Sequence, residues 1–368
     1  MSSAHVHHFY QLALFVYMFI IAPEAHAQTL AKQKPFNNTV SAIFVFGDST
    51  VDPGNNNYIA TPFKGNFLPY GRDFANQNPT GRFSNGRLAG DFIANYVGIK
   101  EYVPPYLDPT LGIEELMSGV SFASAGSGFD PLTPRISNVI PVSKQLEYFK
   151  EYRARLEVLI GKKRTKMLIK NAFYLVSAGT NDFVINYFAM PIRRNSYTLP
   201  SYMEFLLQQV QQFMQGLWDQ GARKFAFVGL PPMGCLPIVI TLNSESPIQQ
   251  RACFEIFSSA ATMYNLMLEN QLNAMQFSLA KFGARIVYLD VYGPLSDMIQ
   301  GRKYDFDEVS SGCCGTGLME ASYLCNPKSF VCTNASKYVF WDSIHPSERA
   351  YYILFEIVRS KIDFIIQD

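Results

Sequence analysis

The stretch Ser41-Ala-Ile-Phe-Val-Phe-Gly-Asp-Ser-Thr50 joins a run of apolar residues to a polar turn. An uninterrupted run of Ile, Val and Phe is typical of a strand buried on both faces, as in a parallel sheet covered by helices. Gly47 permits a sharp turn after this strand and would place Ser49 at its carboxyl end, where open α/β sheets bind their ligands. Taken alone, the stretch is explained better by an ordinary turn, because Gly, Asp and Ser are all common in turns.

Later segments repeat this pattern of a short apolar run that ends in small or turn-forming residues. They are residues 120–128, 172–177, 224–229 and 285–290. Between them, apolar residues recur at helical spacing, which predicts helices over about 200–221 and about 249–282. Strands that alternate with helices, without a linker or a break in composition, indicate one α/β domain. We expect a three-layer α/β/α sandwich with a five-stranded parallel sheet and right-handed crossovers.

Helix ends can be assigned from residues that favour them. Ser84 or Asn85 would cap a helix that contains Leu88. Gly221 stands where a helix C-cap belongs, and Pro346 suits the first position of a last helix.

The amino-terminal segment differs from the rest of the chain. Residues 12–22 form an apolar stretch with the length of a signal-peptide core, shorter than the about 20 apolar residues that span a bilayer. Ala25-His-Ala27 then provides a small-x-small cleavage pattern before Gln28. We therefore predict a signal peptide over 1–27, a single domain over 28–368 and a secreted, extracellular protein with no stable membrane anchor.

Composition limits the partners of this protein. The formal net charge is +1, with 48% hydrophobic and 17% charged residues, so the chain can bury a sizeable core. This balance favours neither a nucleic acid nor an acidic partner, and no obligate protein partner is evident.

The six cysteines all follow the predicted signal peptide. They are Cys235, Cys253, Cys313, Cys314, Cys325 and Cys332. An even number in an oxidising compartment predicts disulfides, whose pairing cannot be deduced from the sequence. A zinc site is the alternative for the last four, but they lack the spacing of paired CxxC units. Asn37 and Asn334 lie in Asn-x-Ser/Thr sequons and are candidate glycosylation sites.

Histidine usage restricts the chemistry further. The chain has five histidines, and the four that precede Gln28 would be lost with the signal peptide. His345 is then the only histidine of the mature protein, so a histidine general base must be this residue. Histidine-rich metal sites are excluded, and we expect no metal and no cofactor.

Asp342 lies three residues before His345, in the segment Trp-Asp-Ser-Ile-His-Pro. One turn of chain can bring its carboxylate to one imidazole nitrogen, which leaves the other nitrogen free to accept a proton from a serine hydroxyl. An isolated DxxH pattern is more often a helix cap beside a surface histidine. Ser49 at the end of a strand supplies the missing nucleophile, which needs such a base.

Acyl transfer also requires hydrogen-bond donors that face the developing oxyanion. Gly126 offers a backbone N–H and Asn181 a side-chain amide, each at the end of a predicted strand. Alone, each is better explained by an ordinary turn. Because the carboxyl ends of parallel strands meet at one edge of a sheet, we expect these groups to lie near Ser49.

Four segments of the sequence resemble the blocks of the GDSL (SGNH) esterase/lipase family. They are Gly47-Asp-Ser-Thr50, the Gly126 turn, Gly179-Thr-Asn-Asp182 and Asp342-Ser-Ile-His345. Other segments are similar to its secreted plant branch, notably Gly81-Arg-Phe-Ser-Asn-Gly-Arg, Gly229-Leu-Pro-Pro-Met-Gly-Cys and Cys313-Cys-Gly-Thr-Gly. The resemblance extends over essentially the whole mature chain.

The resemblance implies a flavodoxin-like fold and ester hydrolysis through an acyl-enzyme, in the apoplast or cell wall for a plant protein. It implies that Ser49 is the nucleophile, His345 the general base and then acid, and Asp342 the residue that orients His345. The backbones of Ser49 and Gly126 and the amide of Asn181 would form the oxyanion hole. Thr50 replaces the leucine of the family name, which we expect to leave the chemistry unchanged. Ser121 replaces an asparagine of many relatives, which leaves the local hydrogen bonding open.

The function expected from these residues is a secreted serine hydrolase of carboxylic esters. The substrate could be a lipid, a cutin-like polyester, a phenolic ester or an acetylated glycan, because nothing in the sequence separates them. An acyltransferase with the same triad is the alternative within catalysis, since water and an alcohol attack the same intermediate. A catalytically weak lipid- or wall-binding protein is the alternative outside it.

Overall fold

Four parallel strands form the central sheet in a computed structural model of the chain, which describes residues 40–246, 248, 251–301 and 303–367. In spatial order they are β1 (Ile43–Gly47), β2 (Phe173–Ser177), β3 (Lys224–Val228) and β4 (Arg285–Leu289). Nearly every residue of these strands is buried, as their apolar runs predict. The predicted signal peptide and Asn37 lie outside the described residues.

The second of the five predicted strands, within residues 120–128, is an irregular edge segment at residues 120–124. Val45 N–H donates to Val120 O (3.2 Å), Phe122 N–H to Val45 O (2.7 Å), and Ser124 N–H to Gly47 O (3.0 Å). The segment therefore runs parallel to β1, but only one residue pair, Val45 and Ser121, has the hydrogen bonding of a regular parallel ladder. With this segment beside β1, the spatial order becomes 2-1-3-4-5 in chain sequence, which is the flavodoxin-like order.

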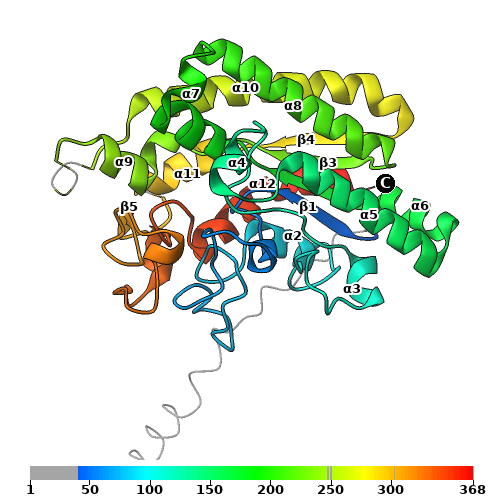
Figure 1. Cartoon of the computed structure of the whole chain (residues 1–368), viewed down its shortest axis with the longest axis horizontal. Helices are drawn as coiled ribbons and strands as arrows, with labels where there is room; N and C mark the ends of the chain where they lie inside the picture. Colours follow the sequence, from blue (N-terminus) through cyan, green and yellow to red (C-terminus); the bar gives the residue numbers. More distant parts are fainter. Residues whose placement is uncertain (1–39, 247, 249–250, 302, 368) are drawn as a thin grey trace, which may run out of the picture. The chain divides into compact units, whose positions relative to one another are not determined.

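Helices cover both faces of the sheet (Figure 1). On one face, the rings of Phe44 and Phe46 pack against Phe149 of α5 (Val142–Ile160), and Phe46 also meets Phe213 of α8 (Leu199–Asp219). The long α10 (Glu255–Leu279) packs on β4 and α8 on the same side. The other face is covered by α2 (Ala89–Tyr96) and α12 (Glu348–Ile366), with α11 (Tyr292–Ile299) against α12. The three-layer α/β/α prediction is therefore confirmed.

Shorter elements connect these layers. They are α3 (Ile113–Ser118), α4 (Thr133–Ser137), α6 (Lys162–Asn171), the π-helix η2 (Asp182–Ala189), α7 (Pro191–Arg194), α9 (Pro237–Asn243) and a two-stranded sheet of β5 (Glu308–Gly312) and β6 (Tyr338–Phe340).

The predicted helix ends are right for α8 and wrong for α2 and α12. Gly221 follows the end of α8 with a φ of 106°. α12 begins at Glu348 and not at Pro346, and Ser347 caps it by accepting the N–H of Ala350. Neither Ser84 nor Asn85 caps α2, which begins after Leu88. Ser84 donates to Pro346 O (3.1 Å), and Asn85 accepts the N–H of Glu348 at the start of α12 (2.8 Å).

All six cysteines form disulfides, which excludes the zinc alternative. The pairs are Cys235–Cys253, Cys313–Cys332 and Cys314–Cys325. The last two, together with Tyr70, Phe83 and Trp341, form a second small core beside the main one. Small sheets bury little apolar surface, so covalent links compensate for a limited core here.

Candidate active site

Ser49, His345 and Asp342 form a continuous hydrogen-bonded chain. His345 Nε2 lies 2.8 Å from Ser49 Oγ, and His345 Nδ1 lies 2.7 Å from Asp342 Oδ2. All three side chains are buried. The distances suit proton transfer from the serine hydroxyl to an imidazole that the carboxylate holds in one tautomer.

The Asp342 side chain folds back onto the turn that leads to His345, as the three-residue spacing predicts. Asp342 Oδ1 accepts the backbone N–H groups of Ile344 (2.9 Å) and His345 (2.7 Å). Trp341 N–H donates to His345 O (2.8 Å). The same carboxylate therefore shapes the turn and holds the imidazole.

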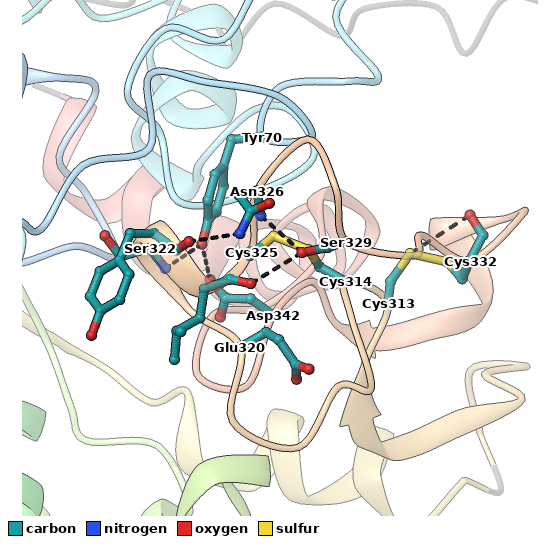
Figure 2. The surroundings of a disulfide bond; sticks show 12 residues. Tyr70, Cys313, Cys314, Glu320, Ser322, Cys325, Asn326, Ser329, Cys332 and Asp342 are labelled. Atoms are coloured by element: carbon teal, nitrogen blue, oxygen red, sulfur yellow. Dashed lines mark hydrogen bonds between the residues drawn. A yellow bond between two sulfur atoms is a disulfide. The ribbon is translucent and has the colours of Figure 1, made fainter.

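Tyr70 is a neighbour of Asp342 that the sequence did not reveal. Its hydroxyl donates to Asp342 Oδ2 (2.8 Å) and accepts the N–H of Ser322 (2.7 Å), as Figure 2 shows. Ser322 lies within the loop closed by the Cys314–Cys325 disulfide. Burial and the nearby Asp342 charge raise the pKa of Tyr70 well above its ordinary value, so the phenol remains a donor. The only sequence signal is the position of Tyr70 in the Pro- and Gly-rich segment after Ser49, which is too general to select it.

The three groups expected to form the oxyanion hole occur near the ends of β1, β2 and the edge segment. The backbone N–H groups of Ser49 and Gly126 donate to no described residue. Asn181 donates one amide hydrogen to Ser127 O (2.9 Å), which leaves its second hydrogen available. This bond ties Asn181 to the residue after Gly126, and Asn181 also lines the same cavity as Ser49.

Two positions require glycine for this arrangement. Gly47 has a φ of 138°, and a Cβ there would lie 1.8 Å from Ser177 O, so β1 and β2 could not end so close together. Gly126 has a φ of 86°, a region that side chains other than glycine rarely adopt.

Thr50 takes part in a polar network that was not expected of it. Its hydroxyl bonds to Asp48 Oδ1 (2.8 Å) and to Ser177 Oγ (2.8 Å), and its N–H also donates to Asp48 (3.0 Å). The pKa of Asp48 is raised to about 6, because the effect of burial exceeds the opposite effect of the hydrogen bonds from Thr50 and of the nearby His345. A leucine at position 50 would have no such hydroxyl. The other departure, Ser121, bonds to Val51 O (3.2 Å) and accepts the N–H of Ala123 (3.2 Å).

An apolar cavity adjoins Ser49 on the face of the sheet that α2 and α12 cover. Its lining includes residues at or near the carboxyl ends of β2, β3 and β4. Its apolar lining includes Ala89, Ile93, Leu175, Val228, Leu289, Leu295, Leu354, Phe355 and Val358. The lining therefore reaches from the end of β1, at Ser49, to the end of β4, at Leu289.

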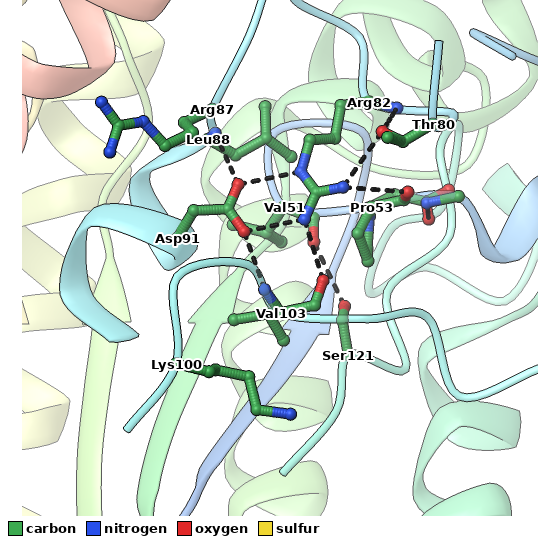
Figure 3. A network of polar contacts seen from close by, with 12 residues as sticks. Val51, Pro53, Thr80, Arg82, Arg87, Leu88, Asp91, Lys100, Val103 and Ser121 are labelled. Atoms are coloured by element: carbon green, nitrogen blue, oxygen red, sulfur yellow. Dashed lines mark hydrogen bonds and ion pairs between the residues drawn. The ribbon is translucent and has the colours of Figure 1, made fainter. Parts of the chain in front are cut away.

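A buried ion pair holds α2 against this site. Arg82 forms two hydrogen bonds with Asp91 (2.8 and 2.7 Å), and both side chains are almost fully buried. Asp91 also accepts the N–H groups of Leu88 and Val103, and Arg82 donates to Val103 O (Figure 3). The network therefore fixes the start of α2, which lines the cavity.

No cluster of three or more metal-binding side chains occurs among the described residues. Within the same residues, no helix is both long and apolar enough to cross a membrane.

Comparison with known proteins assigns the family. The family model described as GDSL-like lipase/acylhydrolase matches residues 43–358. A GDSL esterase/lipase of Arabidopsis thaliana is 60% identical over 338 residues, covering 91% of this chain and 90% of the relative. Another from the same plant is 45% identical over 314 residues, covering 85% and 86%. The solved lipase Lip_vut3 from a goat rumen metagenome is 12% identical with a TM-score of 0.38, covering 88% of this chain and 97% of the lipase, which is too distant to support a conclusion. The chain therefore belongs to the GDSL lipase/acylhydrolase family and is a carboxylic ester hydrolase.

Proposed function

We propose that this enzyme cleaves esters through a Ser49–His345–Asp342 triad and an acyl-enzyme intermediate. The observation that carries the proposal is the unbroken hydrogen-bonded chain from Ser49 Oγ through the imidazole to the Asp342 carboxylate. Since His345 is the only histidine after residue 27, no other imidazole of the described chain competes for this role.

In the first half-reaction, Ser49 Oγ attacks the ester carbonyl carbon while His345 Nε2 takes the hydroxyl proton. The N–H groups of Ser49 and Gly126 and the free amide hydrogen of Asn181 stabilise the negative charge on the carbonyl oxygen. His345 then donates its proton to the departing alcohol oxygen as the C–O bond breaks. In the second half, His345 removes a proton from water as the water oxygen attacks the acyl-enzyme carbonyl carbon. His345 then returns this proton to Ser49 Oγ as the bond from the acyl carbon to Oγ breaks, which releases the acid and the free serine.

The acyl group of the preferred substrate would lie in the apolar cavity beside Ser49. Burial of a methylene group contributes about 0.8 kcal/mol, which is about fourfold in kcat/KM for each carbon that the cavity accepts. An acetyl group would leave most of this surface unused. The lining therefore favours lipid-like or cutin-like esters with apolar acyl chains over acetylated glycans.

The triad is tested with Ser49→Ala on a short-chain nitrophenyl ester. We expect kcat to fall by at least about 10³-fold, as triad deletions do elsewhere. A serine-directed phosphonate should add its mass to the parent enzyme at Ser49 and leave Ser49→Ala unmodified. Equal hydrolysis by the variant and the parent would show that Ser49 is not the nucleophile. Hydrolysis by neither, with no labelling, would favour the binding-protein alternative. Acyl transfer to an added alcohol in place of hydrolysis would favour the acyltransferase.

Secretion and glycosylation are also proposed. Three disulfides suit an oxidising compartment, and Asn334 is exposed at the start of a short 3₁₀ turn. Expression with the native amino terminus should release a protein that begins at Gln28. Removal of N-glycans should shift its mass, and the Asn334→Gln variant should show a smaller shift.

A further inference from the structure

The loop after Ser49 contains three polar side chains that are buried. Asp52, Asn55 and Asn56 are each at most 1% exposed. The sequence Asp-Pro-Gly-Asn-Asn-Asn is typical of a solvent-exposed turn, so this burial has another cause. All three side chains bond to the backbone of residues 121–125, which leads to Gly126.

Asn56 forms the contact that lies nearest to the proposed oxyanion hole. Its Nδ2 donates to Ala125 O (3.0 Å) and to Phe63 O (2.7 Å). Ser124 Oγ accepts the N–H of Ile140 and donates its own hydrogen to Asn56 Oδ1. The bond from Ser124 fixes the orientation of the amide, so Nδ2 is the group that faces Ala125.

Ala125 O and Gly126 N–H belong to the same peptide group. A trans peptide is planar, and its C=O and N–H point in opposite directions. When Asn56 holds Ala125 O on one side, it aims Gly126 N–H to the other side. The N–H of Gly126 donates to no described residue, as expected of a group reserved for a ligand.

The neighbouring peptide groups are held as well. Asp52 Oδ2 accepts the N–H of Ala125 (2.9 Å), and Asn181 donates to Ser127 O (2.9 Å). Rotation of the Ala125–Gly126 peptide would break the Asn56 bond first, because that bond is the one made to this peptide itself. The polarised carbonyl also makes the N–H of Gly126 a stronger donor.

We infer that Asn56 is a positioning residue of the oxyanion hole, acting through the Ala125–Gly126 peptide. The inference rests on the proposed function, in which Gly126 N–H binds the oxyanion. Donors of this kind act mainly in the transition state, so their misalignment lowers kcat and leaves KM nearly unchanged.

Asn55 provides a matched control for Asn56. It is equally buried, and its Nδ2 also donates to two carbonyls, those of Ser121 (2.9 Å) and Ala123 (2.8 Å). Neither of these peptides carries the N–H of Gly126. The two side chains therefore differ chiefly in the peptide that they hold.

The test compares Asn56→Ala with Asn55→Ala in kcat, KM and thermal stability. Loss of one oxyanion donor costs about 10²–10³-fold in kcat, so we expect about tenfold or more for a misaligned donor in Asn56→Ala. We expect a smaller loss of kcat in Asn55→Ala at a similar loss of stability. Equal kcat in the two variants would overturn the inference, while Ser49→Ala would still test the triad independently.

Asn56→Asp provides a second readout, which also applies if the alanine variants fold poorly. An ionised carboxylate cannot donate to Ala125 O, whereas a protonated one can. Burial disfavours ionisation, so the ratio of variant kcat to parent kcat should rise as the pH is lowered. A ratio independent of pH would contradict a donor role for this side chain.

Discussion

The Tyr70 hydroxyl donates a 2.8 Å hydrogen bond to Asp342 Oδ2, although 272 positions separate the two residues in the chain. The same hydroxyl accepts the N–H of Ser322 from the disulfide-closed loop. Tyr70 thus links the carboxylate that holds His345 to the small second core. This arrangement leads to the first two predictions.

Tyr70→Phe should lower kcat by about tenfold or more, because a hydrogen bond to a charged group contributes about 1.5–3 kcal/mol. It should also destabilise the fold, since the buried N–H of Ser322 loses its acceptor. Tyr152→Phe is the control, because Tyr152 is as buried and donates to Leu116 O (2.6 Å), away from the triad. Steady-state kinetics and thermal denaturation of both variants separate the two effects. A similar loss of kcat in both would exclude a specific role for Tyr70.

Removal of the Cys314–Cys325 disulfide by a double serine substitution should reduce activity as well as stability. The bond closes the loop that carries Ser322, whose N–H orients the Tyr70 hydroxyl. We expect a loss of about 2–4 kcal/mol in stability, as for other native disulfides. The Cys235–Cys253 double variant is the comparison, because no described residue of its loop forms a hydrogen bond with Tyr70 or with the Asp342 side chain. That loop meets the Asp342–His345 turn through the bond from Ile238 N–H to Ser343 O (2.9 Å). Equal kcat in the two double variants at a temperature where both are folded would contradict this coupling.

The length of the acyl chain should control the rate through the cavity. Ala89→Phe would fill part of the cavity from α2, so kcat/KM should fall for octanoyl and dodecanoyl esters and change little for acetyl esters. Ala274→Phe, on the exposed side of α10, is the control for the added ring. If Ala89→Phe lowered the rates for all esters equally, the acyl chain would not bind in this cavity.

Protonation of Asp182 should make stability depend on pH. Burial, and to a lesser extent the nearby Asp130, raises the pKa of Asp182 to about 7 although Thr133 and the N–H of Phe129 donate to it. The folded state then binds this proton more tightly than the unfolded state, whose aspartates titrate near about 4. The contribution to folding is therefore largest below about pH 4 and is lost as the pH rises through about 7.

The Asp182→Asn variant removes this titration. The stability of the parent relative to the variant should therefore fall between pH 4 and 7 and stay constant above that range. Urea denaturation of both proteins at several pH values measures this difference. A difference that rose with pH would show that Asp182 is stabilised as the carboxylate instead.

The sequence predicted the α/β class, the identity of the strand regions and the spacing that brings Asp342 to His345. Uninterrupted apolar runs identify buried strands, and helical periodicity located α8 to within two residues at each end, whereas the start of α10 lies six residues after the predicted one. It did not predict that residues 120–124 would form an irregular edge segment. Ser121 there bonds to Val51 O and also pairs with the chain near Pro105 instead of continuing a regular ladder.

Ser49, Asp342 and His345 could be selected from the sequence because each has a chemical role that few residue types can fill, and the last two are neighbours in the chain. The roles of Tyr70, Asn56 and Asn85 were decided only by the tertiary structure. Their side chains bond to Asp342, Ala125 and Glu348, which lie far away in the chain. Residue type and local spacing determine which groups can react and which segments form strands. The partners of a buried polar side chain depend on which distant backbone groups the fold places beside it. The local sequence therefore does not predict these partners.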